Sequence, residues 1–173
     1  MQNNTQKPKN WQKIIGEFKH NSDRSAAILG TTYLQNYLGR LLASYFVPDT
    51  KNTAELLNSS GALSHFDARI RAAYALGLIA PNEFNDLLQI MEIRRIMLNE
   101  FEINKFADDS IRQRCFLLKT PREVIVSGET VTPRQLFIFA VALLSGQLLW
   151  RSEQAEKERR SAPDNFALID LEK

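Results

Sequence analysis

Apolar residues between Pro81 and Asn104 recur at steps of three and four positions, which is the period of an amphipathic helix. They are Phe84, Leu87, Leu88, Met91, Leu98 and Phe101. On a helix that advances about 100° per residue, the polar residues gather on the other side, and they are Asn85, Gln89, Glu92, Asn99 and Glu100. Arg94 falls roughly opposite this polar set. The pattern therefore predicts a packed helix over 81–104 with an arginine near the middle of its apolar face.

The same periodicity predicts helices along the rest of the chain, separated by prolines and by capping residues. Ser64 and Asp67 have the spacing of a capping box, which places a helix start at Ser64. Pro48 ends the longest early helix, because proline in a helix interior removes a hydrogen bond and clashes with the preceding turn. The predicted helices lie near residues 11–18, 23–46, 53–57, 64–77, 81–104, 108–118 and 132–160.

These helices predict an all-α protein with a single helical domain of about six or seven helices. We expect a polar arm and short helix over 1–20, the helical domain over 21–160 and a loosely ordered tail over 161–173. Residues 123–131 have β-branched side chains around a Ser-Gly turn signal, so a small hairpin there is an alternative to an ordered loop.

Composition narrows the class of protein. Lys and Arg number 22 against 20 Asp and Glu, which gives no general attraction to nucleic acid. A single cysteine, Cys115, excludes an intramolecular disulfide and fits the cytoplasm. The first ten residues are polar, unlike the apolar segment of a signal peptide. The apolar run 136–150 is shorter than the roughly 20 residues of a membrane span, so we expect a core helix, no membrane contact, and a homodimer contact as an alternative.

Arg94 is the most unusual candidate for a functional site. An arginine on an apolar face is expected to be paired, because an unpaired buried charge costs several kcal/mol. One interpretation is a structural ion pair with Asp67, Asp23 or Glu17, and the other is a pocket for an anionic ligand or for a partner's carboxylate. Arg69 and Arg95 fit either arrangement.

The sequence offers little for catalysis. His20 and His65 lack the spacing of a metal site, so we expect no metal. Cys115 shares an apolar face with Ile111 and Leu118, which favours a packed thiol over a nucleophile. The glycine-rich phosphate-binding patterns do not occur, so we expect no nucleotide cofactor, and the helices show no helix-turn-helix spacing.

Four separated blocks resemble the family of mannitol operon repressor-like proteins. The first three are Asp23–Leu29 (DRSAAIL), Phe66–Ile79 (FDARI running into AYALGLI) and Arg95–Phe101 (RIMLNEF), the last being similar to the family pattern R-x-I-R-N-x-F-A-H. The fourth is Phe106–Ile111 (FADDSI), similar to F-D-D-P-x-I. Where the R-x-I-R-N-x-F-A-H pattern has its second arginine, alanine and histidine, this chain has Leu98, Glu102 and Ile103.

The resemblance implies a helical, non-enzymatic, cytoplasmic regulator of bacterial transcription. It implies a protein partner, for example a DNA-binding regulator, and no specific DNA binding by the chain itself. We expect the polar cluster at or under the functional surface to contain Asp67, Arg69, Arg94, Arg95 and Asn99, with Arg95 and Asn99 matching the family pattern. Two alternatives remain open: an RNA-cleaving domain of the R-x(4-6)-H type, which lacks its histidine here, and a sensor of a small anionic metabolite.

Overall fold

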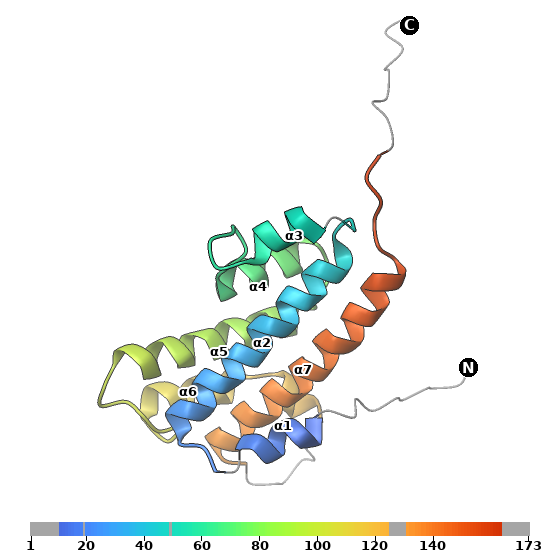
Figure 1. The fold of residues 1–173 in the computed structure, drawn as a ribbon. Coiled ribbons are helices and arrows are strands. Elements are labelled where there is room, and N and C mark those ends of the chain that lie inside the picture. The colour runs from blue at the N-terminus through green and yellow to red at the C-terminus, as the bar shows by residue number, and fades with distance from the viewer. Residues whose placement is uncertain (1–10, 19, 49, 125–130, 164–173) are drawn as a thin grey trace, which may run out of the picture.

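The computed structural model describes residues 11–18, 20–48, 50–124 and 131–163, and within them the protein is all-α, as predicted (Figure 1). The helices are α1 (Trp11–Phe18), α2 (Asp23–Tyr45), α3 (Thr50–Leu57), α4 (Phe66–Ala75), α5 (Pro81–Asn99), α6 (Asp109–Leu117), the short 3-10 helix η1 (Thr120–Glu123) and α7 (Pro133–Lys157). The described residues contain no strand. The core of the suggested hairpin, 125–130, and both chain ends, 1–10 and 164–173, lie outside the described residues.

Helices α2 and α7 form the centre of the bundle and run parallel, side by side (Figure 1). They approach closely at Gly30, where an added Cβ would lie 3.0 Å from a methyl group of Val141 and 3.1 Å from the ring of Phe137. The absence of a side chain at Gly30 lets those two apolar residues pack against the α2 backbone. Close packing of two long apolar faces excludes water from the middle of the molecule.

Helix α7 confirms the prediction of a core helix over the apolar run. Helix α7 is long and apolar enough to cross a membrane by length and composition alone. However, 56% of its most apolar window is buried inside the bundle, as in the core helix of a folded domain. Its fully buried side chains include Phe137, Val141 and Leu144. Thr132 caps its first turn by accepting a hydrogen bond from the Gln135 N–H.

Arg69 attaches the α3–α4 hairpin to α2. Its guanidinium donates hydrogen bonds to the backbone carbonyls of Leu63, Gln35 and Leu57 at 2.7, 2.8 and 2.7 Å. Gly39 of α2 leaves room for it, because a Cβ at that position would lie 2.8 Å from the Arg69 Nη1 atom. The predicted capping box of Ser64 and Asp67 is not formed: α4 begins at Phe66, and its N-cap makes no side-chain hydrogen bond.

Helix α5 ends at Asn99 rather than at the predicted Asn104. The N–H groups of Asn104 and Lys105, which would continue the helix, donate instead to a carboxylate oxygen of Asp108 at 3.0 and 2.9 Å. The carbonyls of Glu100 and Phe101, which those N–H groups would otherwise meet, accept from Arg24. Contacts with Arg24 and Asp108 thus replace the hydrogen bonds of the last predicted helical turn. The spacing of apolar residues does not reveal such contacts, and for this reason it predicted a longer helix.

Candidate functional site

Arg69 and Asp67, two of the residues that the sequence suggested, lie on α4 but have different surroundings. Arg69 is 9% exposed, and desolvation lowers its pKa. Its three bonds to carbonyls use its donors for the fold. Asp67 is exposed and makes no hydrogen bond or ion pair with a described residue. Arg69 therefore has a structural role at this position, and no carboxylate partner accompanies it.

Arg94 has none of the acidic partners that we expected. The ion pair with Asp67, Asp23 or Glu17 is not formed, since Asp23 pairs with Arg134 and Glu17 accepts from the Tyr33 hydroxyl. Arg94 is half-buried, and its Nε atom is buried without a hydrogen-bond partner among the described residues. The helix thus places part of the Arg94 guanidinium in the protein interior without an acidic partner among the described residues.

Arg95 and Asn99 lie on the exposed side of α5, one turn apart. Arg95 donates two hydrogen bonds to the Glu92 carboxylate, at 2.7 and 2.6 Å, and these bonds lower the pKa of Glu92 and raise that of Arg95. Asn99 is exposed. No hydrogen bond or ion pair joins any two of the five residues within the described part of the chain, so the predicted polar cluster is split between α4 and α5.

The loop that follows α5 is held in place through its backbone. Arg24, near the start of α2, donates hydrogen bonds from one terminal nitrogen to the carbonyls of Glu100, Phe101 and Ile103 at 3.1, 2.9 and 3.2 Å. One guanidinium on α2 therefore binds three carbonyls within a stretch of four residues of the loop. Because Arg24 binds backbone atoms, the side chains of the loop remain available for other contacts.

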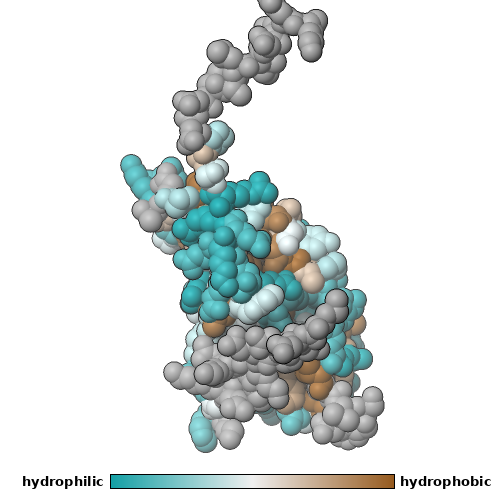
Figure 2. All heavy atoms as spheres, turned by 90° about the vertical axis from the view of Figure 1, so that its right-hand side faces the viewer, coloured by the Kyte–Doolittle hydropathy of each residue, from teal (hydrophilic) through white to brown (hydrophobic). Residues whose placement is uncertain are grey.

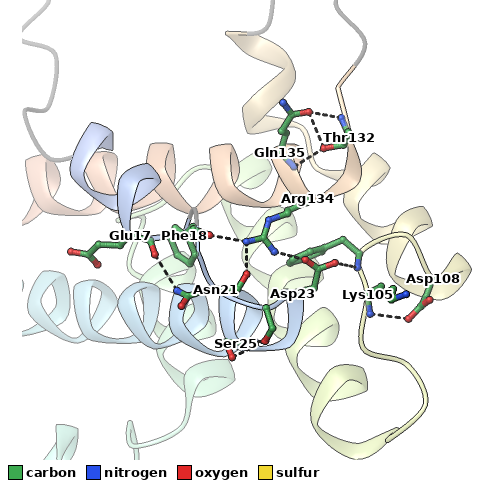
Figure 3. A network of polar contacts seen from close by, with 12 residues as sticks. Glu17, Phe18, Asn21, Asp23, Ser25, Lys105, Asp108, Thr132, Arg134 and Gln135 are labelled. Carbon is green, nitrogen blue, oxygen red and sulfur yellow. Dashed lines mark hydrogen bonds and ion pairs between the residues drawn. The ribbon is translucent and has the colours of Figure 1, made fainter.

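A second group of contacts fixes the far end of this loop (Figure 3). One carboxylate oxygen of Asp23 accepts from the backbone N–H of Phe106 at 2.8 Å, and the other pairs with Arg134 at the start of α7. Arg134 also donates to the carbonyls of Phe18 and Asn21, at 2.7 and 2.8 Å, and so joins the loop, α1, α2 and α7. Figure 3 shows Asp23 between Arg134 and the loop that contains Lys105 and Asp108.

Phe101 is the most exposed large apolar side chain in the described residues, with 85% of its surface accessible. The guanidinium carbon of Arg24 lies 5.7 Å from the centre of its ring, within the range of a cation–π contact. Leu98, one turn earlier, is 46% exposed. We call the exposed residues Arg95, Leu98, Asn99 and Phe101, with Arg24 behind them, the Phe101 surface.

The Phe101 surface has the properties of a protein-contact site. An exposed aromatic residue beside an arginine is the composition typical of binding hot spots, which are rich in aromatic and arginine side chains. The backbone beneath is ordered by Arg24, so binding would cost less conformational entropy than it would for a free loop. The pairing of Arg95 with Glu92 leaves a polar rim on one side of the two apolar residues.

Sequence reasoning did not single out Arg24 or Arg134, and it named Asp23 only as a candidate partner of Arg94. The apolar spacing predicted that Phe101 lies on the buried face of the helix over 81–104, but α5 ends at Asn99 and Phe101 lies in the following loop. One signal was present, since Asp23 and Arg24 begin the first family-like block and Asp108 lies in the fourth. Three of the four blocks, the first, third and fourth, meet at this loop in the structure.

Two features of the described residues bear on metal binding and on cysteine chemistry. No group of three or more His, Cys, Asp or Glu residues is placed to hold a metal ion within the searched part of the chain. Cys115 is fully buried, and burial together with the charge of Asp23 raises the pKa of its thiol to about 12. A raised pKa favours the protonated thiol at neutral pH, which is the form expected of a packed cysteine.

Comparisons with known proteins identify proteins with the same fold. Two solved structures share the fold. One is the MtlR–HPr complex from Escherichia coli, with a TM-score of 0.67, 17% identity and coverage of 80% of this chain and 98% of the other. The second, from Shigella flexneri, is described as a possible transcriptional regulator, YggD, with a TM-score of 0.59, 15% identity and coverage of 84% and 98%. Among curated proteins, none matches the chain.

The family model described as mannitol repressor matches residues 23–146, which include every helix from α2 to α6 and the first half of α7. The match covers well over half of the chain and contains all four of the blocks that resemble the family. The protein therefore belongs to the mannitol repressor family.

Proposed function

We propose that this protein is a non-enzymatic, cytoplasmic regulator of transcription that acts by binding another protein through the Phe101 surface. The family description and the Shigella structure support a regulatory role. The observation that carries the proposed mechanism is Phe101 itself, an aromatic side chain that is 85% exposed above a backbone held by three hydrogen bonds from Arg24. Burying this ring against a partner would remove apolar surface from water at little cost in loop ordering.

HPr is the first partner to test. The similar structure from E. coli is a complex of a mannitol repressor family protein with HPr. We infer that this chain binds the HPr of its own host, and that the Phe101 surface supplies the central apolar contact. A DNA-binding regulator is the second partner to test, because a repressor without its own DNA-reading element needs one to reach an operator.

Titration calorimetry with purified host HPr tests the first proposal. Phe101→Ala is expected to weaken binding at least about tenfold, as truncation of a central aromatic contact does. The matched control is Leu117→Ala on α6, which removes an apolar side chain that is 60% exposed and lies two residues before Lys119, whose N–H binds Asp86 near the opposite end of α5. Equal effects of the two variants, or none from Phe101→Ala, would place the binding surface elsewhere.

A gel-shift experiment separates partner-mediated repression from direct DNA binding. The protein alone, at physiological salt, is expected to give no specific complex with its operator, and a complex is expected only when the partner is added. Specific binding by the purified chain alone would contradict the partner-mediated mechanism. Salt must be fixed, because nonspecific binding to DNA phosphates depends strongly on it.

A further inference from the structure

We propose that a groove between the carboxyl-terminal ends of α2 and α7 binds residues 164–173 of the same chain. The groove, which we call the α2–α7 groove, has a volume of about 360 Å³, and its lining includes Leu41, Tyr45, Ile79, Trp150, Ala155 and Glu158. It lies at the opposite end of α2 from Arg24 and plays no part in the Phe101 surface. The proposal is therefore independent of the proposed function.

The groove combines an apolar wall with a fixed polar floor. Trp150 is 51% exposed, although α7 is otherwise a core helix. Arg151 is held in place by the Glu83 carboxylate and by the Leu78 carbonyl, the latter at 3.0 Å. Figure 2 shows hydrophobic side chains exposed beside a large hydrophilic area on the side of the molecule where α7 lies. A half-exposed tryptophan above anchored polar groups suits an apolar peptide segment better than it suits water.

The chain leaves α7 beside this groove and in a fixed position. Arg159 donates hydrogen bonds to the carbonyls of Ser44 and Ala43, at 3.2 and 3.0 Å, at the end of α2. The guanidinium carbon of Arg160 lies 5.4 Å from the centre of the Tyr45 ring, and Tyr45 itself lines the groove. Two consecutive arginines thus hold residues 159 and 160 at the groove's edge, four residues before the proposed occupant begins.

The final segment has the length and composition to fill the groove. Its sequence, DNFALIDLEK, contains Phe166, Leu168, Ile169 and Leu171. Glu158 lines the groove, and the eight steps from Glu158 to Phe166 span at most about 28 Å, which is sufficient to return to Trp150. The volume of the groove matches one or two large apolar side chains.

Charge also favours this occupant. The segment has the acids Asp164, Asp170 and Glu172 against one lysine, Lys173. The basic residues Lys157, Arg159 and Arg160 precede it in the chain, whereas Glu158 on the groove has the same sign as the segment's acids. Attraction between the acidic residues of the segment and these basic residues would add to the free energy gained by burying its apolar side chains. The few residues between α7 and the segment also keep the segment's local concentration near the groove in about the millimolar range.

The fluorescence of Trp150 in the full chain tests the proposal. Trp11→Phe leaves Trp150 as the only tryptophan. In this background, Phe166→Asp with Leu168→Asp is expected to shift Trp150 emission to longer wavelength and to increase its quenching by acrylamide. The control, Ser161→Asp with Ala162→Asp, adds the same charge before the segment and removes no large apolar group. If Trp11→Phe does not fold, fluorine NMR of the fluorotryptophan-labelled two-tryptophan chain reports the same change.

Four further outcomes support or overturn the proposal. Adding a peptide of residues 164–173 at about 1 mM to the doubly substituted chain is expected to restore the original emission. An unchanged Trp150 signal in the Phe166/Leu168 variant overturns the proposal, and so does an equal change in the control. A signal that depends on protein concentration over a hundredfold dilution also overturns it, because the segment would then bind a second copy.

Discussion

The two ends of α5 use their polar side chains in opposite ways. At the amino end, buried Asp86 accepts hydrogen bonds from the backbone N–H groups of Lys119 and Thr120 at 2.9 and 2.7 Å. Glu83 accepts from the Ala80 N–H at 2.6 Å and pairs with Arg151. At the carboxyl end, Arg24 holds the backbone of the following loop instead, and the side chains of Arg95, Leu98 and Asn99 remain exposed.

The amino end of α5 thus contributes mainly to the stability of the fold, whereas its carboxyl end has side chains that are free to bind a partner. Side chains that bind the protein's own backbone, such as Asp86, are not available to a partner. Where a residue from another helix fixes the backbone, as Arg24 does, the local side chains are free to bind while the surface stays ordered. The carboxyl end of α5 therefore meets both requirements of a binding site, which are order and accessible side chains.

The largest effect on stability is expected from Asp86→Ala at the amino end. The change leaves two part-buried N–H groups, those of Lys119 and Thr120, without their carboxylate acceptor, so the free energy of unfolding should fall by about 3 kcal/mol. Urea denaturation followed by circular dichroism measures this. Asp109→Ala is the control, because its carboxylate is 80% exposed and pairs only with Arg112 at the surface. A similar loss in both variants would contradict the structural role of Asp86.

Arg24→Ala tests whether the loop depends on one side chain. The loss of three hydrogen bonds to carbonyls should lower the free energy of unfolding by about 2 kcal/mol. Faster hydrogen exchange should also appear at the N–H groups of residues 104–106, which lie in the loop that Arg24 holds. Arg40→Ala, an exposed arginine on the same helix, is the control. Unchanged exchange in the loop would show that Asp23 and Asp108 hold it without Arg24.

Phe101→Ala should barely change stability, although we expect it to weaken partner binding. The ring is almost fully exposed, so the free energy of unfolding should change by less than about 0.5 kcal/mol. Thermal unfolding of the isolated protein measures this. A clear loss of stability would mean that Phe101 serves the fold, and the contrast between the two ends of α5 would then disappear.

The smallest effect is expected from Arg95→Ala, and it depends on pH. The Arg95 hydrogen bonds hold the pKa of Glu92 below its ordinary value, so their stabilisation is complete above the unfolded pKa of about 4.3. It is lost as pH falls through the lower pKa of the folded state. The slight difference in stability between wild type and variant at pH 7 should therefore vanish at low pH. A difference that persists there would point to packing by the arginine rather than to charge.

Helix positions were largely predictable from sequence, because the three-to-four-residue period and the prolines report local structure. Pro81 and Pro133 mark the first residues of α5 and α7, and α2 matches its expected range to within one residue. The end of α5 was not predictable in this way. It depends on Arg24 and Asp108, whose contacts with the loop follow from tertiary packing.

The candidate site was less predictable for the same reason. Periodicity identified Arg94 correctly as unusual, but it does not show whether an arginine is paired, and Arg94 has no partner in the described structure. The sequence predicted that Arg69 belongs to a polar cluster, but its three hydrogen-bond acceptors are backbone carbonyls. Every residue has such a carbonyl, so the sequence does not indicate which ones Arg69 binds. The family-like blocks were the better guide, because three of them meet around Phe101.

The parallel pairing of α2 with α7 has a consequence for how the protein folds during synthesis. The apolar face of α2 is complete early in translation, but its main partner follows almost ninety residues later. At roughly 5–20 residues per second, the ribosome leaves that face without α7 for several seconds. During this interval the nascent chain presents the surface around Gly30 that the finished molecule buries, so the growing polypeptide is a natural client for chaperones until α7 emerges.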